Sequence, residues 1–259
     1  SRGYDKRLAV GAINCGGGAY TALDGTRYVA DTYYTGGNVY STSHAIAGTS
    51  DDVLYQSQRY GYGSDFSYAI PLANWNYDIT FRFSEMNYNY TGDQVFNIIA
   101  EGERIVTDLD ILSHVAKYAA YDVTVSSVAV SDGVLNLTFS GLNDAAVCAI
   151  EITPTPPAAT LTASINPITE GTSTVLSWTS TDATFASIDQ GIGEVPLSGT
   201  VSVSPVVTTT YTLTVDGPGG FSTASTTVIV NNLPIVDITV SPGTITDNGL
   251  DFATLSWTT

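Results

Sequence analysis

Apolar and polar residues alternate over short stretches along most of the chain, and the 3.6-residue period of a helix is nearly absent. The alternation is clearest at residues 66–70, 77–83 and 135–139, where every second side chain is aromatic or aliphatic. Such a period places the apolar side chains on one face of a strand. Only residues 112–117 suggest a helical turn. Because glycine-rich turns separate the strands, the pattern predicts an all-β fold built from sandwiches.

The segment Thr-Pro-Thr-Pro-Pro at residues 153–157 separates two parts of different composition. Proline makes such a segment stiff and extended, so we predict a first domain over residues 1–153 and a boundary after it. The later part is rich in Thr, Ser and Val. Its expected core positions are Leu176, Trp178, Tyr211, Leu213 and Val215. A Trp on an early strand with a Tyr on a later one is typical of an immunoglobulin-like sandwich, which we predict over residues 154–232.

An internal repeat follows. The stretch Ala163–Pro167, which leads to Leu-Ser-Trp-Thr at 176–179, recurs as Ile238–Pro242, which leads to the same four residues at 255–258. We therefore predict that residues 233–259 are the first strands of a second immunoglobulin-like repeat. Half a sandwich leaves an apolar face and strand edges uncovered. Either the sequence is a fragment of a longer chain, which we favour, or the half-domain pairs with another subunit in a homo-oligomer.

Tyrosine is concentrated in the first part, since fifteen of the sixteen tyrosines precede residue 122. A tyrosine ring and its hydroxyl suit the apolar faces and hydroxyl edges of sugars, although tyrosine also favours strands. Tyr55, Tyr68 and Tyr77 fit the strand pattern and are expected in the sheets. The tyrosines with glycine or polar neighbours are candidates to widen a binding site: Tyr33, Tyr34, Tyr62 and Tyr90.

Charge limits the choice of partner. The chain has 25 acidic and 8 basic residues, a formal net charge of −17. Nucleic acid and anionic membrane surfaces both need clustered Lys and Arg, so neither is expected to bind. No apolar run is long enough to insert into a bilayer. The composition favours an extracellular or cell-surface protein, and the repeats suggest a bacterial one. The start without Met or signal peptide suggests a mature or trimmed product.

The two cysteines, Cys15 and Cys148, each lie in an apolar, strand-like run near one end of the first domain. If the first and last strands pair, the two residues suit a single disulfide. Two buried thiols fit the sequence equally well.

Motifs for catalysis are missing. His44 and His114 have no Cys, His or Glu at the sequence spacing of metal ligands. Neither a nucleophile elbow nor a phosphate loop occurs. Glu85 lies in an apolar stretch, where a buried carboxylate paired with an arginine such as Arg59 is favoured over a catalytic acid. The sequence therefore predicts no enzyme.

Asp108 and Asp110 are the candidate ligands for a metal. Their spacing suits a structural calcium ion, but acids at such positions more often form turns. We expect no cofactor, with calcium as the alternative.

Five stretches carry a family resemblance in the right order. They are Ala12–Gly17, Leu54–Tyr60, Phe83–Glu85 followed by Gln94–Asn97, Asp108–Ile111 and Val147–Ile150. Together they make the chain from about Leu8 to Ile152 resemble a malectin domain, a non-catalytic carbohydrate-binding family. The resemblance implies a jelly-roll-like β-sandwich whose loops at one end hold the sugar.

The resemblance also implies a set of site residues. The matching positions are Tyr40, Tyr60, Asn87, Tyr88 and Asn143, with Asp144 next to the last. Tyr40, Tyr60 and Tyr88 would stack on the sugar ring or bond to it, and the asparagines would bond its hydroxyls. Asn87 replaces a family aromatic residue and Asn143 a family aspartate, which weakens the expectation of a diglucose ligand. A carboxylate is the stronger acceptor, and nearby Tyr90 and Asp144 are the candidates to compensate for its loss.

Together these patterns predict a non-catalytic extracellular carbohydrate-binding module on an immunoglobulin-like stalk, part of a larger secreted or surface protein. Its expected partner is a glucose-containing oligosaccharide or polysaccharide. The alternative is a structural subunit of a cell-surface layer or fibre that uses the terminal half-domain for strand pairing between subunits. A glycosidase is the least favoured hypothesis.

Overall fold

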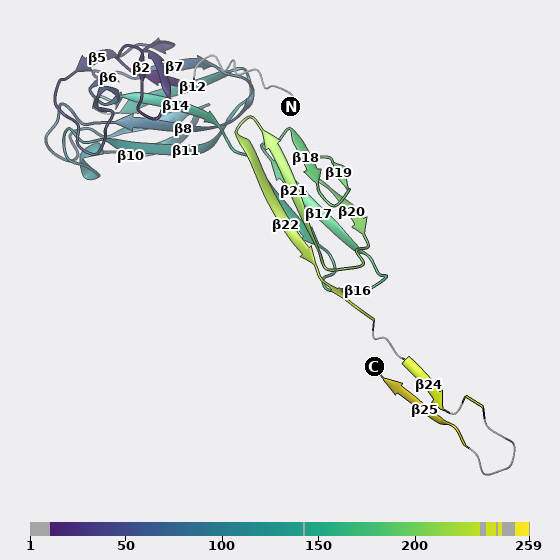
Figure 1. Ribbon diagram of the computed structural model, residues 1–259. Coiled ribbons are helices and arrows are strands. Elements are labelled where there is room, and N and C mark those ends of the chain that lie inside the picture. Colours follow the sequence, from purple (N-terminus) through teal and green to yellow (C-terminus); the bar gives the residue numbers. More distant parts are fainter. Residues whose placement is uncertain (1–10, 142, 234–236, 242, 245–251, 259) are drawn as a thin grey trace. The chain divides into compact units, whose positions relative to one another are not determined.

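The computed structural model describes residues 11–141, 143–233, 237–241, 243–244 and 252–258 (Figure 1). The chain divides into a first unit, Ser1–Pro156 with Pro218–Gly220, and a second unit, Pro157–Gly217 with Phe221–Thr259. Within the described residues there is no α-helix, only the 3-10 helices η1 (Asp52–Leu54) and η2 (Ile111–Ser113). The prediction of an all-β fold is confirmed.

Two sheets form the body of the first unit. The six-stranded sheet has the order β11-β8-β14-β1-β3-β2 and the five-stranded sheet the order β10-β9-β12-β7-β4. The strands of the first are β1 (Ala12–Asn14), β2 (Tyr20–Thr21), β3 (Arg27–Ala30), β8 (Trp75–Phe83), β11 (Tyr121–Val130) and β14 (Ala149–Pro154). Those of the second are β4 (Tyr34–Thr35), β7 (Phe66–Pro71), β9 (Phe96–Ala100), β10 (Glu103–Leu109) and β12 (Val134–Gly141). Both sheets contribute to one apolar core, so the unit is a β-sandwich.

The core follows the predicted alternation. On β8 every second residue from Tyr77 to Phe83 is buried, and the residues between are half-buried. Phe66 of β7 stacks on Phe139 of β12, with ring centroids 4.7 Å apart. Tyr68 and Tyr77 are buried on strands, as predicted. Tyr55 is also buried, but it follows η1 and does not lie on a strand.

A third, small sheet completes the first unit. It has the order β13-β6-β5 and consists of β5 (Asn38–Ser41), β6 (Ser57–Tyr60) and β13 (Ala146–Val147). Because β13 runs into β14 of the six-stranded sheet after one residue, Cys148, the small sheet is joined directly to the sandwich. This sheet carries two of the predicted site residues.

The two cysteines meet where the first and last strands of the unit pair. The amide of Cys15 donates to the carbonyl oxygen of Cys148 at 2.8 Å, next to the paired residues Asn14 and Ala149. Both thiols are free and buried. Burial raises the pKa of Cys148 to about 12 and that of Cys15 well above its usual value. Of the two alternatives left open by the sequence, the structure has the pair of buried thiols.

Between residues 158 and 231, the described part of the second unit contains three sheets, ordered β15-β17-β20, β19-β18-β21-β22 and β16-β23. Their strands are β15 (Ala158–Ala163), β16 (Ile168–Thr169), β17 (Thr174–Thr181), β18 (Phe185–Ile188), β19 (Gly193–Glu194), β20 (Gly199–Val203), β21 (Thr209–Gly217), β22 (Gly220–Val228) and β23 (Val230–Asn231). All five predicted core residues are buried in one cluster that both larger sheets supply. Trp178 donates its indole N–H to the carbonyl oxygen of Pro196 at 2.8 Å.

A separate hairpin of β24 (Asp237–Ser241) and β25 (Thr254–Thr258) contains the second copy of the repeat. Trp257 pairs with Ile238, and in the first copy Trp178 pairs with Leu161. Ile238 is therefore the counterpart of Leu161, not of Ala163, so the sequence alignment through the prolines was shifted by two residues. Pro242 and residues 234–236, 245–251 and 259 lie outside the described residues.

Candidate functional site

The small sheet positions Tyr40 and Tyr60. Asn38 of β5 pairs with Tyr60 of β6, and Tyr40 pairs with Gln58, so Tyr40 and Tyr60 lie diagonally on one face. Tyr40 is exposed and Tyr60 half-buried. On the other side of β6, Tyr60 pairs with Ala146 of β13. This pairing brings the loop between β12 and β13, with Asn143 and Asp144, beside Tyr60.

Asp144 connects three loops. Its Oδ2 accepts the hydroxyl proton of Tyr88 at 2.8 Å, and its Oδ1 accepts the amide of Gly63 at 3.2 Å. Asp144 has a left-handed backbone (φ 34°), which any residue other than glycine rarely adopts. Partial burial and the bond to Asp144 raise the pKa of Tyr88 to about 12, so its hydroxyl stays protonated. The loops β6–β7, β8–β9 and β12–β13 thus meet at one carboxylate.

The two asparagines have different surroundings. The side-chain amide of Asn143 donates to the carbonyl oxygen of Asp93 at 3.1 Å, a further bond between the β12–β13 and β8–β9 loops. The side chain of Asn87 is exposed, and its backbone carbonyl oxygen accepts a hydrogen bond from the Lys117 ammonium at 2.9 Å. Of the predicted site residues, the structure therefore joins Tyr88, Asn143 and Asp144 by hydrogen bonds between their loops and Tyr60 to them by strand pairing.

Glu85 supports the turn that presents Asn87 and Tyr88. Strand β8 ends at Phe83, and the carboxylate of Glu85, 2% exposed, accepts the amides of Asn87 at 2.6 Å and Tyr88 at 2.7 Å. Burial raises the pKa of Glu85. The predicted pairing of Glu85 with Arg59 is wrong, because this carboxylate accepts hydrogen bonds from backbone amides and Arg59 has another partner.

That partner is Asp31, which the sequence did not single out. The Arg59 guanidinium bonds to Asp31 Oδ2 at 2.6 Å and donates to the carbonyl oxygen of Gly36 at 2.9 Å. Tyr34 lies over the guanidinium, 3.3 Å from ring centroid to Cζ, and the Tyr68 hydroxyl donates to Asp31 Oδ1 at 2.9 Å. Every polar atom of this buried pair has a partner, so it holds the chain around β4 to β6.

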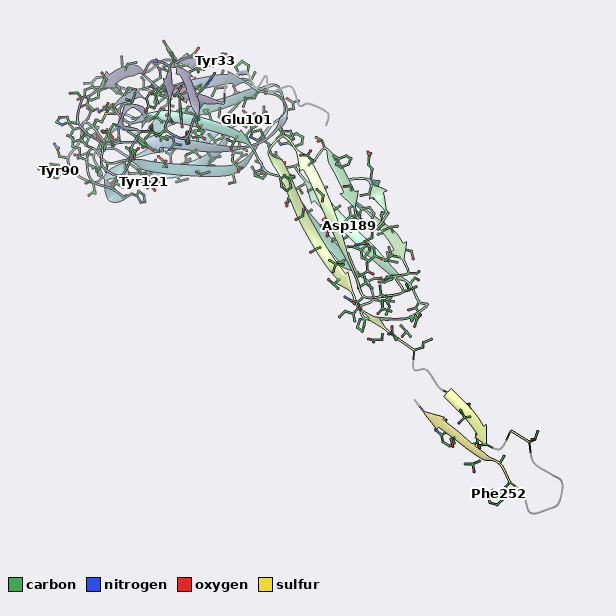
Figure 2. All side chains as sticks on the ribbon, viewed as in Figure 1. Tyr33, Tyr90, Glu101, Tyr121, Asp189 and Phe252 are labelled. Atoms are coloured by element: carbon green, nitrogen blue, oxygen red, sulfur yellow. The ribbon has the colours of Figure 1, made fainter. Side chains whose placement is uncertain are left out.

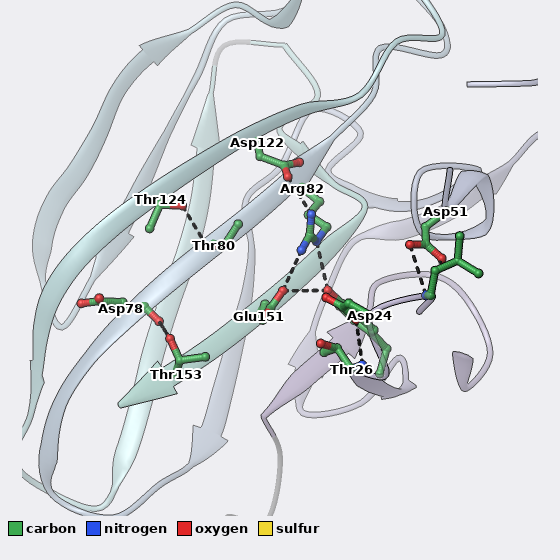
Figure 3. Close-up of polar contacts among 12 residues, drawn as sticks. Asp24, Thr26, Asp51, Asp78, Thr80, Arg82, Asp122, Thr124, Glu151 and Thr153 are labelled. Carbon is green, nitrogen blue, oxygen red and sulfur yellow. Dashed lines mark hydrogen bonds and ion pairs between the residues drawn. The ribbon is translucent and has the colours of Figure 1, made fainter. Parts of the chain in front are cut away.

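A second charged cluster lies on the face of the six-stranded sheet that points away from the core (Figure 3). Arg82 bonds to Asp122 at 2.6 Å and to Glu151 at 2.7 Å. The hydroxyls of Tyr28 and Tyr55 donate to Glu151 and Asp122 at 2.8 and 2.7 Å. The alternation along β8 places Arg82 on the outer face, and this is the sequence pattern from which the cluster could have been predicted. The cluster is internally satisfied and joins strands β3, β8, β11 and β14.

Other candidate sites find little support in the described part of the chain. No group of three or more His, Cys, Asp or Glu residues there could hold a metal ion. Asp110 accepts the amide of Gly92 at 2.8 Å, a loop contact. His44 and His114 stack on Tyr118 and Tyr121. The described residues include no helix with the length and apolar character needed to span a bilayer.

Comparison with known proteins gives a family match over the first unit. A family model described as the malectin domain matches residues 9–159. Malectin-B of Xenopus laevis is 31% identical over 143 residues, 50% of each chain. Human malectin is 29% identical over 119 residues, 43% of this chain and 40% of that protein. The chain thus spans about half the length of these curated relatives, or less.

Among solved structures, the extracellular domain of ANXUR1 from Arabidopsis thaliana is 17% identical. The similarity covers 54% of this chain and 46% of that one, with a TM-score of 0.48.

Proposed function

Because the chain belongs to the malectin domain family, we propose that its first unit is a non-catalytic carbohydrate-binding module for glucose-containing oligosaccharides. The observation that carries the proposal is the convergence of three loops on Asp144, which brings Tyr88, Asn143 and Tyr60 to one end of the unit. Stacking rings and fixed hydrogen-bonding groups together are what a sugar requires.

The site binds by recognition without turnover. The Tyr88 hydroxyl donates to Asp144 and retains a lone pair to accept a sugar hydroxyl. Each oxygen of Asp144 has accepted one hydrogen bond and retains capacity for another. The exposed amide of Asn87 supplies both donors and an acceptor. Tyr40 and Tyr60 supply aromatic faces on the adjoining sheet.

Asp144 takes the role that the family gives to the preceding position. The Asn143 side chain is engaged with the backbone of Asp93, whereas the Asp144 carboxylate lies against the Tyr88 hydroxyl. The left-handed backbone at Asp144 supports this shift of the acid by one residue.

We further propose that residues 154–232 are an immunoglobulin-like stalk and residues 233–259 the start of a second such repeat, in an extracellular or cell-surface protein. The buried Trp178 and Tyr211 of the second unit support the first part. The matching register of Trp178 with Leu161 and of Trp257 with Ile238 supports the second.

Calorimetric titration of the whole chain with gluco-oligosaccharides tests the binding function. We expect Tyr60→Ala and Asp144→Ala each to weaken binding at least tenfold, an amount that corresponds to about 1.4 kcal/mol. Phe221→Ala, at a 75% exposed aromatic residue of β22, is the matched control and should bind like the wild type. Absence of binding to all glucosides, or full affinity in Tyr60→Ala, would contradict the proposal.

One observation favours a second candidate, a subunit of a cell-surface layer or fibre. Ile238, Leu255 and Trp257 are 59%, 53% and 65% exposed, so the hairpin has an apolar face that another subunit could cover. Sedimentation analysis separates the candidates, because a strict monomer at high concentration excludes pairing through this face.

A further inference from the structure

Tyr62 and Tyr90 are the most exposed tyrosines of the described chain, at 75% and 74%. Tyr62 lies in the β6–β7 loop and Tyr90 in the β8–β9 loop, two of the three loops that meet at Asp144. Figure 2 shows Tyr90 at an outer end of the first unit. A single exposed tyrosine needs no explanation. Two such residues on loops joined to the same candidate site do need one.

The backbone on both sides of Tyr62 is fixed. The amide of Gly61 donates to the carbonyl oxygen of Ala145 at 2.9 Å, and the amide of Gly63 donates to Asp144 Oδ1 at 3.2 Å. Gly63 has a φ of 61°, which glycine adopts without strain. The loop β12–β13 therefore holds Tyr62 by its two neighbours, while its ring remains free of the core.

Tyr90 is held in a comparable way. It begins a turn in which the amide of Asp93 donates to the Tyr90 carbonyl oxygen at 3.3 Å. The amide of Gly92 donates to Asp110 at 2.8 Å, and the carbonyl oxygen of Asp93 accepts the side-chain amide of Asn143 at 3.1 Å. The same loop, β12–β13, thus bonds to both neighbours of Tyr62 and to the end of the turn that Tyr90 begins.

We propose that Tyr62 and Tyr90 are additional subsites that bind further glucose units of a neutral polysaccharide, beside the centre formed by Tyr88 and Asp144. The inference rests on the proposed function and extends its ligand from a short gluco-oligosaccharide to a longer chain. Loops that are already anchored lose little conformational freedom on binding, so stacking of a sugar on each ring is not offset by ordering of the backbone.

Charge favours a neutral ligand. The described residues of the three loops include Asp65, Asp93 and Asp144 and contain no Lys or Arg. Lys117 is a base beside them, and its ammonium bonds to Asn87 and Asn89. An anionic polysaccharide would meet these carboxylates in a chain of net charge −17.

The test is calorimetric titration of the whole chain with gluco-oligosaccharides of two to six units, in α- and β-linked series. For the wild type we expect affinity to rise with chain length. Tyr62→Ala and Tyr90→Ala should each lower the affinity for the longer oligosaccharides roughly two- to tenfold, the usual range of an aromatic stacking contact. Neither variant should change the affinity for the disaccharide. Tyr62→Phe, which keeps the ring, should retain the gain.

Phe221→Ala controls for the loss of an exposed ring elsewhere. A wild type that binds the disaccharide with no gain from longer chains overturns the inference and leaves the proposed function standing. The same holds if both alanine variants keep the full gain, or if glucuronate-containing chains bind more tightly than neutral ones. Failure of the wild type to bind any member overturns the proposed function itself.

Discussion

Both units have an apolar core, but they differ in the polar residues that they bury. The first buries Arg59, Glu85 and Gln94 among other polar residues, whereas Thr174 is the one polar residue of the second unit found buried in the described chain. In the first unit Arg59, Glu85 and Gln94 each bond to loop backbone, and the loops they hold carry the candidate site. In the second, a purely apolar cluster joins the sheets. Buried polar networks fix the position of loops, while apolar packing is sufficient to hold two sheets together.

The sharpest way to break this contrast is to remove one member of the buried ion pair. Asp31→Ala leaves the Arg59 guanidinium buried without its carboxylate, and we expect a loss of about 3–5 kcal/mol in the free energy of unfolding. Urea unfolding measures it. Glu194→Ala, at an exposed residue of β19, is the control and should stay within about 0.5 kcal/mol of the wild type.

The double variant Asp31→Leu/Arg59→Met identifies the cause. Replacing both charges by apolar groups should recover most of the loss, because no unpaired charge remains. A loss below about 1 kcal/mol in Asp31→Ala would show that the first unit does not depend on this pair.

The stability of the second unit should depend on the volume of its buried side chains. Leu213 is fully buried in its cluster, so Leu213→Ala should cost about 2–5 kcal/mol through the lost contacts and the cavity. Leu213→Met conserves volume and should cost less than about 1.5 kcal/mol. Equal losses in the two variants, measured by urea unfolding, would contradict an apolar packing role.

The smallest expected effect is a pH dependence confined to the first unit. Burial raises the pKa of Glu85 in the folded chain above the value near 4.3 of an unfolded glutamate. Between these two values the folded state binds the extra proton, so stability falls as pH rises through that window, by at most about 1.4 kcal/mol per pH unit.

Comparison of the wild type with Glu85→Gln isolates this contribution. Unfolding measured from pH 4.5 to 7.5 should show the wild type losing stability relative to the variant as the pH rises. A relative gain with rising pH would mean that the amide bonds of Asn87 and Tyr88 outweigh burial.

Strands and core could be predicted from the sequence because a period of two needs only local information. The alternation at Tyr77 to Phe83 fixed the core face of β8 and also placed Arg82 outside. The partners of buried charges could not be predicted this way. Arg59 and Asp31 are 28 residues apart, and their pairing depends on how the chain around β4 to β6 folds back.

Two other predictions were wrong because the sequence does not show where a strand ends or how its residues pair. Glu85 follows an apolar strand in sequence, but the strand ends two residues earlier and the carboxylate turns to its own loop. The repeat alignment matched the two prolines and was therefore shifted by two residues in the first strand. The strand residue that pairs with the Trp lies two residues farther from the proline in the first copy than in the second. The positions of Asn87, Asn143 and Asp144 came from the family resemblance, and their roles in binding stay predictions.

The buried thiols of Cys15 and Cys148, whose backbones are hydrogen-bonded to each other, make local opening of the first unit measurable. A thiol reacts with alkylating reagents only as the thiolate and only when reagent can reach it, and both groups are buried with raised pKa values. Reaction therefore waits until the pairing of the first and last strands separates. The rate at which the unmodified chain is alkylated then measures how often these strands separate, and no probe has to be added.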